Sequence, residues 1–306
     1  MGQVVQSRMC KALRVPLLLL ALAGCGGDGG PESEVTGSLK LGSQTRIYIT
    51  FESRGAKIRG WLDVPAVAAS KGPVPALVWV HGSGDERLDD RAAVYAEQLD
   101  PRFAFFNHER NPKPPDGFDD IAADTLAAAS AVHEHDAVDD DAVGLVALGV
   151  GGWVTPLVLT KSKDVSFAVV FSGPVVSVGE ENLFEKLTGN HPCAPTGISD
   201  AEIQRRVNAA GPSHFDPRPA LKRVNVPVLW VYGDRDRQQP VAKDIGVLKA
   251  LKREGRPFTW VVLPKANHEL LATEGTGACW EGGRRGGRLS PRLGPTVNGW
   301  LRSNVG

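Results

Sequence analysis

Short apolar runs alternate with amphipathic segments along most of the chain. Six of these runs have the length expected of strands buried on both faces of a sheet: residues 75–80, 103–106, 143–148, 165–171, 226–232 and 258–263. Apolar spacing and acidic starts predict helices between and after them: residues 91–99, 116–132, 153–159, 242–253 and 295–302. This order predicts an α/β fold with a mostly parallel sheet covered by helices on both faces.

Two alternating segments precede the first buried run. Residues 46–51 and 56–62 place apolar and polar side chains in turn, and a short Ser-Arg-Gly stretch separates them. Alternation with a period of two is typical of strands with one buried face. We therefore expect an antiparallel hairpin at the start of the folded body.

The first 24 residues have the pattern of a signal peptide. Arg8, Lys11 and Arg14 precede an apolar stretch at residues 15–22 that is too short to span a bilayer, and small residues lead to Cys25. The segment resembles a bacterial lipobox, which implies cleavage before Cys25 and a lipid on its sulfur. An ordinary secretory signal is the alternative. The expected location is the bacterial cell envelope, with a lipid anchor at the periplasmic face of the outer membrane.

Residues 25–43 are rich in Gly, Ser, Pro and Glu, and we expect a flexible tether there. Residues 44–306 then form one domain. Removal of residues 1–24 takes away three of the 35 basic residues and none of the 35 acidic ones, which leaves a net charge of −3. A balance so close to neutral gives no electrostatic indication of a nucleic-acid partner.

Glycines interrupt the chain directly after the apolar run at residues 143–148. The sequence there reads Leu148, Gly149, Val150 and two further glycines, and a helical stretch follows. A strand that turns this sharply into a helix is the arrangement of a nucleophile elbow. In this chain the residue at the apex of the turn is Gly149.

Three other polar motifs follow buried runs. The first is His-Gly-Ser-Gly at residues 81–84, the second is Gly-Asp-Arg-Asp at residues 233–236, and the third is a loop that contains His268. Each motif alone has an ordinary structural explanation, such as a glycine turn, a pair of solvated aspartates or a loop histidine. Their order along the chain, elbow then acid then histidine, is what carries information.

Together these motifs resemble the α/β hydrolase superfamily, and they are most similar to its dienelactone-hydrolase-like and peptidase-like bacterial branch. The resemblance extends from about Arg46 to the end. It implies that Asp236 orients the imidazole of His268, which is the candidate base. It also implies an oxyanion hole formed by backbone N–H groups at Ser83 or Gly84 and at Val150.

The same resemblance places a serine where this chain has Gly149. Without a hydroxyl there, the ordinary acyl-enzyme mechanism is excluded at this position, and three possibilities remain. The protein binds a small molecule or partner in the cleft without catalysis. Alternatively His268 and Asp236 activate a water for ester or acyl hydrolysis, or another serine is recruited, with Ser83 a better candidate than Ser172.

Residues 177–219 differ in character from the rest and correspond to the insertion that forms a cap in α/β hydrolases. Cys193 lies in this segment and Cys279 lies beyond the histidine loop, so the two are candidates for a disulfide outside the cytoplasm. The sequence leaves their pairing open. We expect no metal or cofactor, and the expected partner is a small-molecule ligand or an acyl- or peptide-like substrate.

Overall fold

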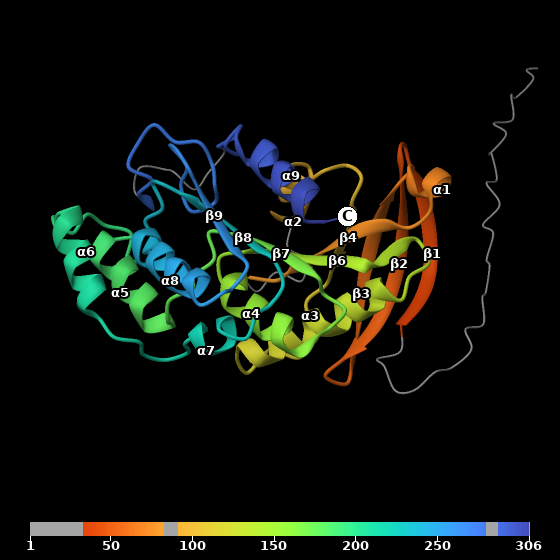
Figure 1. Ribbon diagram of the computed structural model, residues 1–306, viewed down its shortest axis with the longest axis horizontal. Helices are drawn as coiled ribbons and strands as arrows, with labels where there is room; N and C mark the ends of the chain where they lie inside the picture. The colour runs from red at the N-terminus through yellow and green to blue at the C-terminus, as the bar shows by residue number, and fades with distance from the viewer. Residues whose placement is uncertain (1–32, 83–90, 280–286, 306) are drawn as a thin grey trace, which may run out of the picture.

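The computed structural model of the chain describes residues 33–82, 91–279 and 287–305. These residues contain a nine-stranded sheet in the order β1-β2-β3-β5-β4-β6-β7-β8-β9 (Figure 1). Strands β1 to β3 and the β3–β5 pair are antiparallel, and every pair from β5 to β9 is parallel. The strands are β1 (Ser33–Leu41), β2 (Gln44–Ser53), β3 (Ala56–Pro65), β4 (Val74–Val80), β5 (Ala104–His108), β6 (Val138–Leu148), β7 (Phe167–Phe171), β8 (Val228–Gly233) and β9 (Phe258–Leu263).

The parallel strands are mostly apolar because they are covered on both faces. In β4, Ala76 and Val78 pack into one hydrophobic cluster, whereas Leu77 and Trp79 pack into the other. Side chains of a strand alternate between faces, so a continuous apolar run is what two covering layers require. The α/β fold predicted from the sequence is confirmed.

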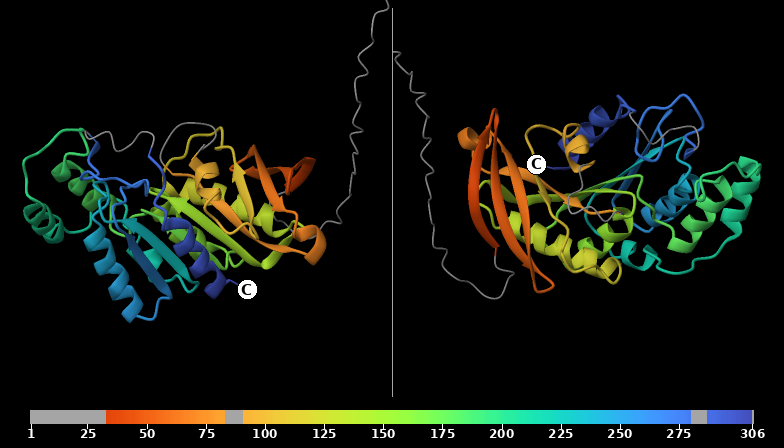
Figure 2. Two further views of the ribbon diagram at one scale, coloured as in Figure 1. Left: turned by 90° about the horizontal axis from the view of Figure 1, so that it is seen from above. Right: turned by 180° about the vertical axis from the view of Figure 1, so that it is seen from behind.

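Helices from different parts of the chain cover the two faces of the sheet (Figures 1 and 2). α3 (Phe118–His133), α4 (Gly151–Lys161) and α8 (Val241–Arg253) contribute to one cluster, and α2 (Arg91–Ala96) and α9 (Leu293–Asn304) contribute to the other. A one-turn helix, α1 (Ala68–Lys71), connects β3 to β4. Within the described ranges, no helix combines the length and apolar character that crossing a bilayer requires.

The insertion between β7 and β8 is helical. It contains α5 (Val178–Thr188), α6 (Asp200–Ala209) and α7 (Arg218–Leu221), and α5 and α6 share a small apolar cluster of their own. In Figure 1 these two helices lie at the end of the molecule opposite β1 to β3. The predicted cap segment is therefore a helical subdomain beside the last strands of the sheet.

The tether expected at residues 25–43 is wrong for its second part. Ser33–Leu41 forms β1, which pairs with β2 at the edge of the sheet. Val35 and Leu39 remain 55% and 50% exposed. The composition is compatible with a linker because almost none of these side chains is buried, and the strand is held by backbone pairing that composition does not reveal.

Candidate functional site

The elbow is a single left-handed residue between β6 and α4. Gly149 has a φ of +53°, which glycine adopts without the steric penalty of a Cβ. Its N–H donates to the carbonyl of Phe171 over 2.9 Å, and its carbonyl accepts from the N–H of Gly152 over 2.8 Å. The turn is thus fixed by the neighbouring strand and by the first turn of the helix.

Small residues allow α4 to approach the sheet closely. A Cβ at Gly152 would lie 2.6 Å from the Cα of Gly173, in the segment that follows β7. A Cβ at Gly151 would lie 2.8 Å from the Cβ of Ala147. The backbone of the elbow therefore depends on glycines 151 and 152, which the sequence motif contains.

The acid and the histidine come from the loops after β8 and β9. The Nδ1 of His268 lies 2.9 Å from Oδ2 of Asp236. The other carboxylate oxygen of Asp236 accepts backbone N–H groups of Gln238 and Gln239 at 2.8 and 2.9 Å. These bonds fix the carboxylate, and the carboxylate in turn fixes the tautomer and orientation of the ring.

The elbow faces the free nitrogen of this ring. A Cβ built at Gly149 would lie 3.3 Å from Nε2 of His268 and 3.9 Å from its Cε1. Among the residues that the structure describes, none hydrogen-bonds to Nε2. The structure thus brings together Gly149, Asp236 and His268, the three residues that the sequence predicted to meet.

The charge of His268 follows from its surroundings. Burial lowers the pKa of the imidazole, but the charge and hydrogen bond of Asp236 outweigh this effect and raise the pKa to about 9. Glu269 and Glu181 act in the same direction. The ring is therefore an imidazolium at neutral pH, with one N–H toward Asp236 and the other toward the elbow.

Backbone donors lie on the elbow side of the same space. In the described part of the chain, the N–H groups of Val150 and Gly151 donate to no acceptor, because the helical bonds of α4 begin with Gly152. Unpaired N–H groups at a helix start favour negative charge. The predicted donors Ser83 and Gly84 lie outside the described residues.

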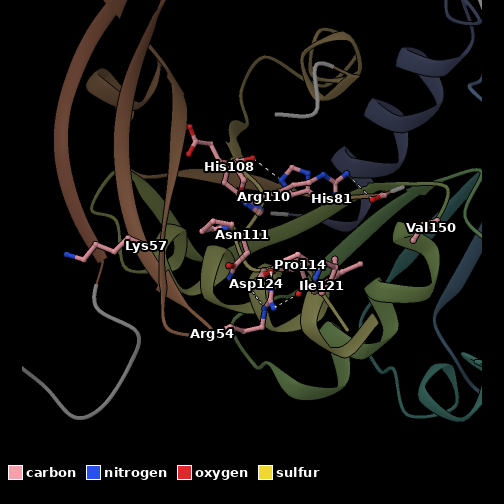
Figure 3. A pocket seen from close by; sticks show the side chains of 15 residues that line it. Arg54, Lys57, His81, His108, Arg110, Asn111, Pro114, Ile121, Asp124 and Val150 are labelled. Carbon is pink, nitrogen blue, oxygen red and sulfur yellow. Dashed lines mark hydrogen bonds and ion pairs between the residues drawn. The ribbon is translucent and has the colours of Figure 1, made fainter. Parts of the chain in front are cut away.

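A cavity of about 760 Å³ adjoins the elbow at Val150 (Figure 3). Its wall includes His81, Arg110, Asn111 and Asp124. Asp124 is held by several donors, including the amide of Asn111 over 2.8 Å. The volume is in the range of small-molecule sites. Arg110 and Asn111 were not predicted as site residues, although polar residues so soon after the buried strand β5 are a pattern that could have indicated them.

The histidine of the His-Gly-Ser-Gly motif is structural. His81 is 4% exposed, and its Nε2 donates to the carbonyl of His108 over 2.8 Å. Burial lowers the pKa of His81 well below its ordinary value, and the charges of His108 and Arg110 add to this effect. His81 is therefore neutral and anchors the end of β4 to β5.

The helical insertion reaches the site through Glu181 on α5. Its Oε1 lies 3.4 Å from the amide nitrogen of Gln239, in the same loop as Asp236. Burial raises the pKa of Glu181 to about 8, and the neighbouring charge of Glu185 adds to the rise. No local sequence signal indicated this contact, because it depends on how the insertion packs against the acid loop.

The two cysteines within the described residues meet. Cys193 and Cys279 form a disulfide with a Cα–Cα distance of 5.8 Å and a sequence separation of 86 residues. The bridge joins the insertion to the chain that follows His268. The predicted lipidation site Cys25 lies outside the described residues.

Two further groups among the described residues carry candidate chemistry. Ser172 is fully buried, and its hydroxyl has no hydrogen-bond partner in the parts of the chain that are described. In those same parts, one group of carboxylates has oxygens close enough together, within 4.8 Å, to consider a metal: Asp139, Asp140 and Asp141. They lie near the start of β6, whereas the elbow follows its end.

Comparison with known proteins agrees with this fold. Residues 118–278 match the prolyl oligopeptidase family, and no curated protein matches the sequence. Among solved structures, Est1E from Butyrivibrio proteoclasticus is 13% identical, with a TM-score of 0.55 over 84% of this chain and 98% of that one. The acylaminoacyl peptidase of Pyrococcus horikoshii is 15% identical, with a TM-score of 0.58 over 87% of this chain and 42% of that one. At these identities the likeness demonstrates a shared fold.

Proposed function

The chain belongs to the prolyl oligopeptidase family, and from that premise we propose that it is a hydrolase homologue without a covalent nucleophile. It binds a ligand with a carbonyl or carboxylate group at the elbow and forms no acyl-enzyme. One observation carries this proposal. The position from which a nucleophilic side chain would project is Gly149, and a Cβ there would face Nε2 of His268 at 3.3 Å.

The groups around this space suit a negatively polarised oxygen. Val150 and Gly151 present unpaired N–H groups at the start of α4. His268, whose pKa is raised to about 9, presents a protonated Nε2 toward Gly149. Such donors stabilise an oxyanion when a reaction forms one, and they bind a ligand carboxylate when no reaction occurs. The adjoining cavity of about 760 Å³ accommodates the rest of the ligand.

The retained Asp236–His268 bond supports a second candidate, hydrolysis by an activated water. In this mechanism Nε2 takes a proton from a water beside Gly149, and the resulting hydroxide attacks the carbonyl. A base must be unprotonated, and the pKa of His268 is about 9. Activity of this kind therefore rises with pH up to about 9 and disappears in His268→Ala.

Restoring the hydroxyl tests the proposal. Above about pH 9, where His268 loses its proton, we expect the wild type to hydrolyse 4-nitrophenyl acetate little faster than buffer does, and Gly149→Ser to gain turnover of about 10³-fold or more, because the base and the N–H donors are already in position. Gly149→Ala is the matched control, since it introduces the same Cβ without a hydroxyl. Equal activity in the serine and alanine variants would contradict the proposal.

We also propose that the protein is held at a membrane by a lipid on Cys25, as the signal pattern of residues 1–24 supports. Strand β1 begins at Ser33, so only a short segment would separate the lipid from the folded body. Radiolabelled palmitate should label the wild type and not Cys25→Ala when each is expressed in a lipoprotein-processing bacterium. Equal labelling of both proteins would exclude this anchor.

A further inference from the structure

Neighbouring glutamates on α5 differ in how their charge is balanced. Glu180 is 1% exposed, and its carboxylate lies 2.6 Å from Nζ of Lys243 and 2.8 Å from Nη2 of Arg218. It also caps the helix by accepting from Ser177. Glu180 is thus fully paired and attaches the insertion to the rest of the fold.

Glu181 has no such partner. In the described parts of the chain, neither a lysine nor an arginine pairs with Glu181 or with Glu185 one turn along the helix. Glu185 accepts from the neutral amide of Asn190 over 2.7 Å. Like charges four residues apart on a helix repel one another. Burial and the charge of Glu185 raise the pKa of Glu181 to about 8, so this carboxyl is largely protonated at neutral pH, and a cation bound beside it would favour its ionised form.

Glu181 borders the elbow site. Glu181 and His268 influence the pKa of one another, and Asp236 adds a further negative charge to the surroundings of Glu181. Asp236 already neutralises the imidazolium through the contact of 2.9 Å. Within the described residues Glu181 therefore has no lysine or arginine partner, and it is only partly buried.

Gln239 supplies a second, independent indication of a ligand. Its side chain extends from the acid loop to Glu181, with Nε2 at 3.4 Å from the carboxylate. The residue is 2% exposed, and its Oε1 is buried without a hydrogen-bond partner in the described ranges. A buried carbonyl oxygen without a donor is destabilising. A ligand N–H at this position would satisfy both that oxygen and the carboxylate.

We propose that Glu181 and Gln239 form a subsite for an organic cation, such as an ammonium or amidinium group, on the insertion side of the elbow. This inference rests on the proposed function, since the same ligand extends to the carbonyl or carboxylate position beside Gly149. The bound cation pairs with the ionised form of Glu181, and Oε1 of Gln239 accepts one of its N–H groups. The insertion thereby selects ligands by charge.

Calorimetric titration of the full mature protein with benzamidinium, and with its neutral isostere benzamide, tests the subsite. We expect benzamidinium to bind the wild type at least about ten-fold more tightly than benzamide. Glu181→Gln should remove this preference, which corresponds to a loss of about 10- to 100-fold for a charge-assisted hydrogen bond. Glu254→Gln, at an exposed glutamate after α8, is the matched control and should leave the preference unchanged.

Glu185→Gln is a second variant for the same titration. It removes a neighbouring negative charge but leaves the carboxyl of Glu181 in place, so it should weaken benzamidinium binding less than Glu181→Gln does. The subsite is refuted if the wild type binds benzamidinium no better than benzamide, or if Glu181→Gln keeps the preference. The esterase activity of Gly149→Ser is measured separately. If that activity appears while benzamidinium does not bind, the cation subsite is wrong and the proposed function stands.

Discussion

The elbow and the two loops that face it supply different parts of one site. The loops after β8 and β9 supply side chains, since Asp236 and His268 are bonded to each other over 2.9 Å. The elbow supplies backbone, because Gly149 contributes no side chain while Val150 and Gly151 present N–H groups. The difference shows that the conformation of the elbow depends on close packing around it and does not require a hydroxyl at its apex.

The largest expected effect on stability is that of removing the disulfide between Cys193 in the insertion and Cys279 beyond the histidine loop. In the chain-entropy model, a disulfide that closes a loop of this length stabilises the fold by about 4 kcal/mol. The double variant Cys193→Ala and Cys279→Ala should lose about this much free energy of unfolding in urea. Reducing agent should destabilise the wild type and leave the double variant unchanged. A loss within the error of the measurement would show that packing alone holds the insertion.

The pairing of Asp236 with His268 can be tested by the pH dependence of the free energy of unfolding. Folding raises the pKa of His268 from its ordinary value of about 6.5 to about 9, so the folded state binds this proton more tightly. The resulting stabilisation, roughly 3 kcal/mol, is complete below about pH 6.5 and is lost as the pH rises through about 9.

Urea unfolding between pH 6 and 10 should therefore show a loss of stability with rising pH that is much smaller in Asp236→Asn. Titration of the His268 ring by NMR should place the pKa of the wild type near 9 and that of Asp236→Asn well below it. Similar curves for the two proteins would show that Asp236 does not control the charge of the ring.

Substitution of Gly152 tests whether the elbow depends on close backbone packing. Its Cβ would lie 2.6 Å from the Cα of Gly173, and backbone cannot easily move away. Gly152→Ala should therefore lower the free energy of unfolding by about 2 kcal/mol, although alanine favours a helix. Gly246→Ala in α8 is the control, because no atom lies within 4 Å of its Cβ position, and this variant should be slightly stabilised. Equal effects of the two substitutions would disprove the close-packing argument.

The smallest effect is expected at the apex itself. Gly149→Ala places a side chain at a φ of +53° and 3.3 Å from Nε2 of His268. The left-handed conformation costs a residue with a Cβ about 1 kcal/mol, and the ring must move by a few tenths of an ångström. Thermal unfolding should show a reduction of this size. A loss of several kcal/mol would mean that position 149 cannot accept any side chain.

The buried framework could be predicted from the sequence because each parallel strand fills two hydrophobic clusters and therefore appears as a continuous apolar run. The edge strand β1 could not, because its side chains are exposed and only backbone pairing holds it. Strand β6 begins at Val138 rather than at the predicted residue 143, because its first part carries Asp139, Asp140 and Asp141, of which the last two are exposed.

The candidate site likewise contains residues that the sequence predicts and residues that it does not. Gly149, Asp236 and His268 follow strands whose carboxyl ends lie at one edge of the sheet, so their meeting could be predicted from order alone. Glu181 and Gln239 meet through the packing of the insertion against the acid loop. No spacing along the chain encodes that packing, and the two residues become part of the site only in the folded structure.

Reaction with a fluorophosphonate, followed by intact-protein and peptide mass spectrometry, tests the central claim most directly. The reagent modifies a serine only where a base activates it and N–H donors receive the oxygen. In reactions above about pH 9, where His268 is unprotonated, we predict no adduct on the wild type or on Gly149→Ala, and one adduct at position 149 of Gly149→Ser that is lost when His268→Ala is added. An adduct on a native serine of the wild type, or none on Gly149→Ser, would contradict the account.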